Sequence, residues 1–125
     1  MFAFVIYEIE SKNIFAARDT KGVKPLYYHI KNNKIIFCSE IAPILKLIDT
    51  EEIDEIGLRQ YLKLRLFSNG HTIYKSIKIV KPGYYYYDGK FIKYFNNIDQ
   101  IDTDDGNKSL LSCLKRSISK REMAD

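Results

Sequence analysis

The sequence has no tryptophan and few of the residues that carry redox or metal chemistry: its 125 residues include only two cysteines and two histidines. Cys38 and Cys113 lie far apart in unlike surroundings, with no Cys-x-x-Cys or histidine spacing, which argues against a zinc site or a disulfide framework. We interpret both as free thiols of a cytoplasmic protein. No apolar run approaches the roughly 20 residues that span a bilayer, so no membrane partner is predicted.

A concentration of charge of one sign is also missing. Lysine and arginine together number 20 and aspartate and glutamate 16, and the resulting net charge of +4 is spread along the chain. This pattern predicts a solvated, lysine-rich surface and no nucleic-acid partner, since nucleic-acid binding would require a basic patch that gives salt-dependent retention on polyanions. The four tyrosines at 84–87 could stack on bases, but alternate rings of a strand point to opposite faces, which favours sheet packing.

Residues in a pattern typical of catalysis are scarce as well. His29 lies in a tyrosine-rich segment and His71 beside a glycine, with no local ligand spacing. The six glycines are scattered, which excludes the common glycine-rich phosphate loops. The acidic pairs at 51–52 and 104–105 are expected to be solvated, and Cys38, in an apolar run, is expected to pack rather than to react. No catalytic, substrate-binding or metal-binding residue is therefore predicted.

Hydrophobic periodicity predicts a mixed α/β fold in one domain-sized unit. The first strand is almost continuously apolar, so we expect both of its faces to be covered. Asn32–Asn33 and Asp88–Gly89 are predicted tight turns, and Asp54 is a predicted helix N-cap. The predicted strands are 2–9, 14–19, 26–30 and 34–40, as a meander, and short strands within 71–80, 82–89 and 90–95; the predicted helices run from 40 or 41 to 47 and from 54 to about 68.

The end of the sequence differs from the rest. Residues 97–107 are acidic and without periodicity, which is typical of a linker. From Lys108, four apolar residues fall on one face of an amphipathic helix, opposite a basic face. No other part of the sequence is obviously built to receive this helix, so we expect it to be the first element of a further domain.

Three segments in order, MFAFVIYE, ARDTKGVKPLYY and FCSEIAPIL, resemble motifs of the class II glutamine amidotransferases, especially the glutaminase domain of the glutamine-hydrolysing asparagine synthetases. Residues 53–95 resemble the family's continuation through a TIxxxIxxLxPGxY motif, and KREMAD resembles the residues just ahead of an SGGLDS loop. The resemblance implies an α/β (α+β) fold of the Ntn-hydrolase type, a four-layer αββα sandwich with antiparallel sheets, incomplete in this chain. The implied domains are 1–96, the second half of the glutaminase-like domain; 97–107, a linker; and 108–125, the truncated first helix of an ATP-dependent asparagine synthetase domain.

The same resemblance bears on the segment from Arg18 to Pro25. Arg18 and Asp19 are expected to end a strand, Gly22 to adopt a turn conformation, and Pro25 to fix the entry to the next strand, a mainly architectural role. As an alternative, Arg18, Asp19 and Lys24 would help to line the junction between the glutaminase and synthetase domains.

Two further residues of the matching segments lie at the end of a predicted strand. Ser39 and Glu40 are expected to cap the helix that comes next, a structural role rather than a chemical one. With Arg18, Asp19, Gly22, Lys24 and Pro25, they complete the candidate set of structural or domain-junction residues.

In the family that the sequence resembles, a cysteine at position 1 attacks the amide of glutamine, with its own α-amino group as base, and the ammonia travels to an ATP-activated aspartyl intermediate. Here residue 1 is methionine and residue 2 phenylalanine. We therefore expect a fragment of an asparagine synthetase-like amidotransferase, a ligase of asparagine biosynthesis, that is inactive alone. No cofactor is expected in this chain, because ATP and Mg²⁺ belong to the absent synthetase domain.

The expected partners follow from this interpretation. They are a complementing amidotransferase chain, or a second copy of the same chain, bound through exposed sheet edges. The alternative hypothesis is a non-catalytic scaffold or interaction module that pairs with a complementing or full-length amidotransferase chain.

Overall fold

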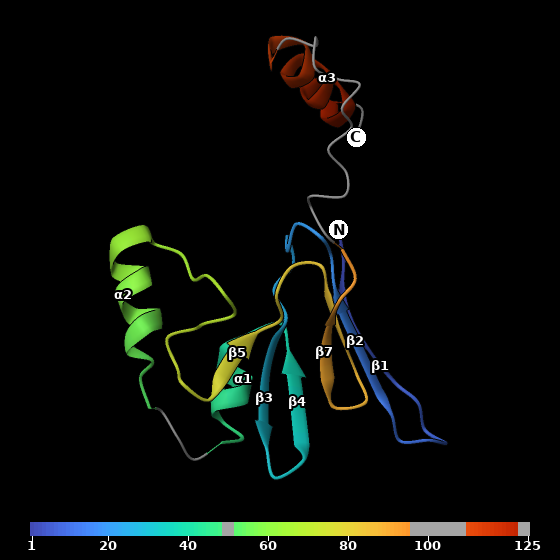
Figure 1. The fold of residues 1–125 in the computed structure, drawn as a ribbon, viewed down its shortest axis with the longest axis vertical. Coiled ribbons are helices and arrows are strands. Elements are labelled where there is room, and N and C mark those ends of the chain that lie inside the picture. Colours follow the sequence, from blue (N-terminus) through green and yellow to red (C-terminus); the bar gives the residue numbers. More distant parts are fainter. Residues whose placement is uncertain (49–51, 96–109, 123–125) are drawn as a thin grey trace.

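The computed structural model describes residues 1–48, 52–95 and 110–122. None of the helices in these ranges combines the length and the apolarity needed to cross a membrane. The elements are drawn in Figure 1 and run in the order β1 (Ala3–Tyr7), β2 (Ile14–Arg18), β3 (Tyr27–Lys31), β4 (Lys34–Cys38), α1 (Ile41–Leu45), α2 (Glu55–Leu64), β5 (Ile77–Ile79), β6 (Tyr84–Tyr87), β7 (Lys90–Lys93) and α3 (Leu110–Glu122).

The strands form two antiparallel sheets, with the orders β1-β2-β6-β7 and β4-β3-β5. The predicted meander of the first four strands is therefore wrong, because the chain crosses from one sheet to the other between β2 and β3. β2 pairs instead with β6, with Ala17 opposite Tyr85, and β3 pairs with β5, with His29 opposite Ile77. The fold is a mixed α/β architecture with two antiparallel sheets, an incomplete αββα sandwich.

The core lies between the two sheets and is largely aromatic. Buried Ala16, on β2, leaves room for large rings that approach from both sheets. The Tyr28 and Phe91 ring centroids are 4.4 Å apart, and those of Phe37 and Tyr86 are 5.5 Å apart. Aromatic pairs at these separations add to the free energy gained by burying their area. This packing fixes the sheets face to face.

The predicted two-residue turns are confirmed. Asn32 and Asn33 have φ angles of 50° and 58°, and Asp88 and Gly89 have 46° and 77°. Such left-handed pairs match the twist of the flanking strands in hairpins. Within the segment 71–80, Ile77–Ile79 joins a sheet as β5, a short strand as predicted.

Helices cover the two sheets unequally. α1 packs on β3 and β4 and buries Ile44, whereas the outer face of the β1-β2-β6-β7 sheet has no helix packed on it in the described ranges. Phe4, Val5 and Ile6 of β1 are accordingly 39%, 42% and 55% exposed. The expectation that this strand is covered on both faces is therefore wrong for the described residues, because four of its five residues are exposed.

The predicted amphipathic helix is present as α3, and its apolar residues are exposed: Leu110, Leu111, Leu114 and Ile118. The predicted linker at 97–107 lies outside the described residues. So do the acidic pair at 104–105 and one member, Glu51, of the pair at 51–52.

Candidate functional site

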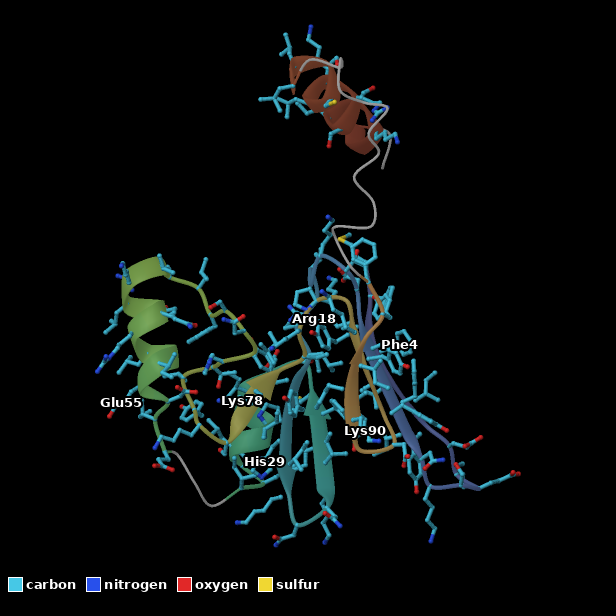
Figure 2. The ribbon with its side chains drawn as sticks, viewed as in Figure 1. Phe4, Arg18, His29, Glu55, Lys78 and Lys90 are labelled. Atoms are coloured by element: carbon cyan, nitrogen blue, oxygen red, sulfur yellow. The ribbon has the colours of Figure 1, made fainter. Side chains whose placement is uncertain are left out.

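The end of β2 is held by one arginine that binds three backbone carbonyls. The Arg18 guanidinium donates to the carbonyl oxygens of Lys24 (2.8 Å), Val80 (2.6 Å) and Gly22 (2.7 Å). Burial lowers the pKa of Arg18, and the nearby Asp19 carboxylate partly offsets this. Figure 2 shows Arg18 where the ends of the two sheets come together. Arg18 thus joins its own turn to the segment that precedes β6.

Asp19 closes the same turn from the other side. Its Oδ1 accepts from the backbone N–H groups of Lys21 and Gly22, both at 2.8 Å, and its Oδ2 accepts from that of Phe2 at 3.1 Å. Burial acts to raise the pKa of Asp19, but these N–H donors outweigh it, and the pKa is lowered. Gly22 has a φ of 64°, and an added Cβ would lie 2.7 Å from Pro82 Cγ. The Asp19 carboxylate and the left-handed conformation of Gly22 therefore both stabilise the backbone of the turn.

The remaining candidates do not join this turn in one site. Lys24 contributes its carbonyl to Arg18, and its side chain, like Pro25, is exposed. Glu40 is the N-cap residue of α1 but its side chain makes no capping bond, so the capping role predicted for Glu40 is wrong. Ser39 is exposed. In the part of the chain that the structure describes, no hydrogen bond links Ser39 or Glu40 to the Arg18 turn.

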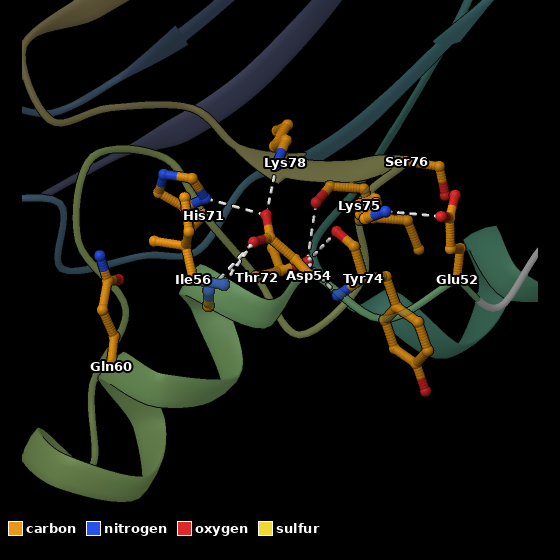
Figure 3. A network of polar contacts seen from close by, with 12 residues as sticks. Glu52, Asp54, Ile56, Gln60, His71, Thr72, Tyr74, Lys75, Ser76 and Lys78 are labelled. Atoms are coloured by element: carbon orange, nitrogen blue, oxygen red, sulfur yellow. Dashed lines mark hydrogen bonds and ion pairs between the residues drawn. The ribbon is translucent and has the colours of Figure 1, made fainter.

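A second polar cluster surrounds Asp54 (Figure 3). The prediction that Asp54 is the N-cap of α2 is confirmed. Its Oδ1 accepts from the backbone N–H groups of Ile56 and Gly57, both at 3.1 Å. Its Oδ2 accepts from His71 Nδ1 at 2.9 Å and from Lys78 Nζ at 2.8 Å. One buried carboxylate thus ties the start of α2 to the loop before β5 and to β5 itself.

The bonds to Asp54 determine what it can do. Burial acts to raise its pKa, but the hydrogen bonds from Lys78, His71 and Gly57 outweigh burial and hold the pKa far below the usual range. A carboxylate that is ionised and already accepts four hydrogen bonds is a poor general base. We interpret the cluster as structural, and we call Asp54, His71 and Lys78 the latch, because their bonds hold the start of α2 against β5. Sequence reasoning missed His71 and Lys78, because they lie 17 and 24 residues from Asp54 and carry no local signal.

The other residues considered for chemistry are dispersed. Cys38, in β4, and Cys113, in α3, are free and partly buried. His29 is buried in β3, and its Nδ1 lies 2.8 Å from the Ser76 carbonyl oxygen. Within the described ranges, no group of three histidine, cysteine or acidic side chains could hold a metal ion.

The two-sheet fold and the motifs that build the Arg18 turn agree with the comparison to known families. A family model described as "Glutamine amidotransferase domain" matches residues 1–94. The chain belongs to the glutamine amidotransferase domain family, which confirms the resemblance found in the sequence.

Several of the relatives that the chain resembles are glutamine-hydrolysing asparagine synthetases by name. The chain is 35% identical over 83 residues to asparagine synthetase [glutamine-hydrolyzing] 1 of Bacillus subtilis, a match that covers 66% of this chain and 13% of the relative. It is 35% identical over 86 residues to asparagine synthetase [glutamine-hydrolyzing] 3 of the same organism, covering 67% and 14%. A match to a probable asparagine synthetase [glutamine-hydrolyzing] of Acanthamoeba polyphaga mimivirus, 30% identical over 143 residues, covers 99% of this chain and 23% of the relative. The chain therefore spans less than a quarter of each of these relatives and is similar to their glutaminase domains.

Proposed function

We propose that this chain supplies the scaffold of a glutaminase domain in a glutamine-dependent, asparagine synthetase-like amidotransferase, and that the reactive groups are supplied by other residues. The complete enzyme would release ammonia from glutamine and use it, with ATP and Mg²⁺ in a synthetase domain, to convert aspartate to asparagine. The family match ends at residue 94 and α3 begins at Leu110, in keeping with a glutaminase-like unit at 1–96, a linker at 97–107 and a synthetase helix from 108. A cytoplasmic location is part of this proposal, and two free cysteines are in keeping with it.

The position of the cysteines is the observation that carries the proposal. The family resembles hydrolases in which the catalytic cysteine uses its own α-amino group as base. Cys38 lies inside β4 and Cys113 inside α3, so the α-nitrogen of each is held in a peptide bond and is not basic. In the described ranges, no histidine hydrogen-bonds to either thiol to replace that base. Neither cysteine is therefore equipped to attack the amide of glutamine.

We predict that the 125-residue chain, folded by circular dichroism, releases no ammonia from glutamine above the buffer rate. The physical reason is the lack of an activated thiolate at Cys38 and Cys113. The measurement is a coupled ammonia assay, with a full-length glutamine-hydrolysing relative run in parallel to show that the assay responds. The matched control is the double variant Cys38→Ser, Cys113→Ser, which is expected to give the same rate. Ammonia release that disappears in this variant would show that an internal cysteine is the nucleophile and would overturn the proposal.

A partner is proposed from the surface of β1. This strand pairs with β2 on one side, and in the described ranges its other edge has no strand beside it. Its apolar side chains are exposed on both faces, and the outer face continues into a row of aromatic rings: Phe2, Phe4, Phe15, Tyr85 and Tyr87. An unpaired strand edge flanked by apolar surface is a template for another strand. We propose that a complementing amidotransferase segment adds to this edge and covers the aromatic face.

Without that segment, the chain is expected to self-associate through β1. The variant Ile6→Lys, on a residue that is 55% exposed, places a charge on the contact surface and should shift the chain toward monomer in sedimentation velocity. Ile9→Lys is the matched control, because Ile9 is also exposed (80%) but follows β1. It should leave the self-association unchanged. A wild-type chain that sediments as a monomer at all concentrations, with a single cooperative unfolding transition, would contradict the proposed edge contact.

The same exposed edge favours a second candidate function, a non-catalytic scaffold or interaction module that pairs with a complementing or full-length amidotransferase chain. The two candidates differ in one measurement. A complementing segment that contains the cysteine nucleophile should gain glutaminase activity when it binds this chain. In contrast, an interaction module should bind a full-length enzyme that is already active.

A further inference from the structure

A cavity lies where the loop that follows α2 meets the end of β2 and the start of β6. Its volume is about 630 Å³, which is within the range of small-molecule sites. The rings of Phe67 and Tyr84 form part of its wall. None of the described residues that line it is acidic, and four are basic: Arg18, His71, Lys81 and Lys93. The cavity therefore offers aromatic surface together with positive charge.

The latch fixes one of these basic side chains. His71 Nδ1 lies 2.9 Å from Asp54 Oδ2, and because this carboxylate is ionised, Nδ1 must carry the proton. The His71 side chain is 25% exposed, and its other ring nitrogen, Nε2, is neither buried nor hydrogen-bonded in the described ranges. Figure 3 shows this edge of the ring turned away from Asp54. Since His71 lines the cavity and Asp54 does not, we infer that the Nε2 edge is the part of the ring that faces the cavity.

Lys81 brings an ammonium group to the same wall. Its Nζ lies 6.0 Å from the centre of the Tyr84 ring, a cation–π contact that keeps the ammonium group beside the cavity. In the described ranges, no carboxylate lies within ion-pair distance of Lys81. Arg18 adds positive charge, but its guanidinium is occupied by three backbone carbonyls. An anion in the cavity would therefore contact Lys81 and His71 rather than Arg18.

The aromatic wall is also held in place. Phe67 stacks on Tyr61, with ring centroids 5.4 Å apart and 15° between the ring planes. Between Phe67 and His71 the chain makes a tight turn, in which Asn69 and Gly70 have φ angles of 55° and 83° and the His71 N–H donates to the Ser68 carbonyl. The ring and the imidazole thus belong to one ordered loop. A flat apolar group is the natural match for such a wall.

We propose that this cavity binds a small aromatic carboxylate. The carboxylate accepts a hydrogen bond from Nε2 of the protonated His71 ring and pairs with the Lys81 ammonium group, and the aromatic body lies against Phe67 and Tyr84. Since one water takes up about 30 Å³ in the liquid, a cavity of about 630 Å³ has room for an aromatic acid together with waters. The proposal does not depend on the amidotransferase activity of the complete enzyme.

The two histidines of the chain make a direct test possible. The imidazole nitrogens of the ¹⁵N-labelled 125-residue chain are followed by NMR at pH 6 during titration with sodium benzoate at constant ionic strength. We expect His71 Nε2 to shift in a saturable way. His29 does not line the cavity, and its Nδ1 is bound to the Ser76 carbonyl, so its signals should not follow the same curve. A His71 ring that does not respond to benzoate overturns the proposal.

Two related molecules separate the charge of the ligand from its ring. Benzamide has nearly the shape of benzoate without the charge, and acetate has the charge without the ring. In titration calorimetry, each should bind about tenfold more weakly than benzoate, because each loses either the charged contacts or the aromatic ones. Benzamide that binds as tightly as benzoate would show that no anion is recognised. Acetate that binds as tightly would show that no ring is recognised, and either result overturns the proposal.

A matched pair of lysine variants tests the contact with Lys81. Lys81→Gln should weaken benzoate binding about threefold, a modest effect because the side chain is exposed. Lys34→Gln removes the same charge from an exposed residue of the β3–β4 hairpin that does not line the cavity, and should leave the affinity unchanged. Circular dichroism checks that both variants fold. Equal losses in the two variants would mean that only the net charge of the chain matters, which overturns the site.

The pH profile of binding tests the role of His71. Asp54 and Lys78 face it from the latch, and the other titratable or charged residues that line the cavity are Arg18, Tyr27, Lys81, Tyr84 and Lys93. Of all these types, only histidine usually titrates between pH 8 and pH 5.5, and Asp54 stays ionised there because its pKa is held far below the usual range. Benzoate should therefore bind roughly tenfold more tightly at pH 5.5 than at pH 8.

His71→Gln completes this test, because glutamine can still donate to Asp54 but cannot take up a proton. In this variant, benzoate binding should be weak and independent of pH between 5.5 and 8. An affinity of the unchanged chain that does not vary with pH would show that protonated His71 is not a ligand contact and would overturn the proposal, whether or not the variant folds.

Discussion

Replacement of Arg18 by methionine is expected to remove roughly 3 kcal/mol or more from the free energy of unfolding, a large part of what a domain of this size has. The guanidinium binds the carbonyl oxygens of Gly22, Lys24 and Val80 at 2.6–2.8 Å, and Arg18 is 7% exposed. Methionine keeps much of the apolar volume but leaves three carbonyls without that donor. Unpaired buried polar groups cost free energy. The measurement is urea unfolding followed by circular dichroism.

Two further substitutions separate the role of the guanidinium from charge and from side-chain size. Lys24→Met also replaces a charged residue of this turn by methionine. Arg18 binds only the backbone carbonyl of Lys24, and the Lys24 side chain is exposed, so the free energy of unfolding should change by no more than about 0.5 kcal/mol. Arg18→Lys keeps the charge but replaces the planar fork by a single ammonium group, and most of the loss should remain. If Arg18→Met were as stable as Lys24→Met, the architectural role of Arg18 would be refuted.

The parts of the fold that short-range chemistry determines could be predicted from the sequence. Asn32–Asn33 and Asp88–Gly89 adopt the left-handed turn conformations expected of these residue types, and Asp54 caps α2 through its neighbours' N–H groups. Each depends on residues within a few positions of one another. The family followed from three segments that resemble its motifs in the same order, and the class of fold followed from the family.

The parts that depend on distant partners could not be predicted. The sequence of a hairpin shows the same alternation whether the strand that pairs with its free edge is the next one along the chain or a distant one. Nothing near Ala17 therefore indicated that Tyr85 would lie opposite it. The same holds for the latch, where His71 and Lys78 reach Asp54 from a different part of the chain. For β1, the apolar composition predicts a strand covered on both faces, whereas the structure leaves its side chains largely exposed. This difference is the reason to propose a partner there.

Replacement of Gly57 by alanine is expected to destabilise the fold by roughly 3 kcal/mol, although helix propensity alone would favour alanine by about 1 kcal/mol. Gly57 lies in the first turn of α2, and an added Cβ would be 1.9 Å from the Thr72 carbonyl oxygen. Thr72 cannot easily move, because it is fully buried and its hydroxyl donates to the Ile77 carbonyl at 2.7 Å. The helix must therefore move away, which breaks the latch at Asp54.

Hydrogen exchange and thermal unfolding together test this prediction. In Gly57→Ala, the amides of α2 should lose protection more than those of β2 or β6, since the helix detaches while the two sheets stay packed. Gly89→Ala is the control: its Cβ would meet nothing within 4 Å, and the cost should be the roughly 1 kcal/mol of a left-handed backbone, at a φ of 77°, with no effect on α2. A more stable Gly57→Ala variant would mean that propensity decides at this position and that α2 is not pressed against the Thr72 segment.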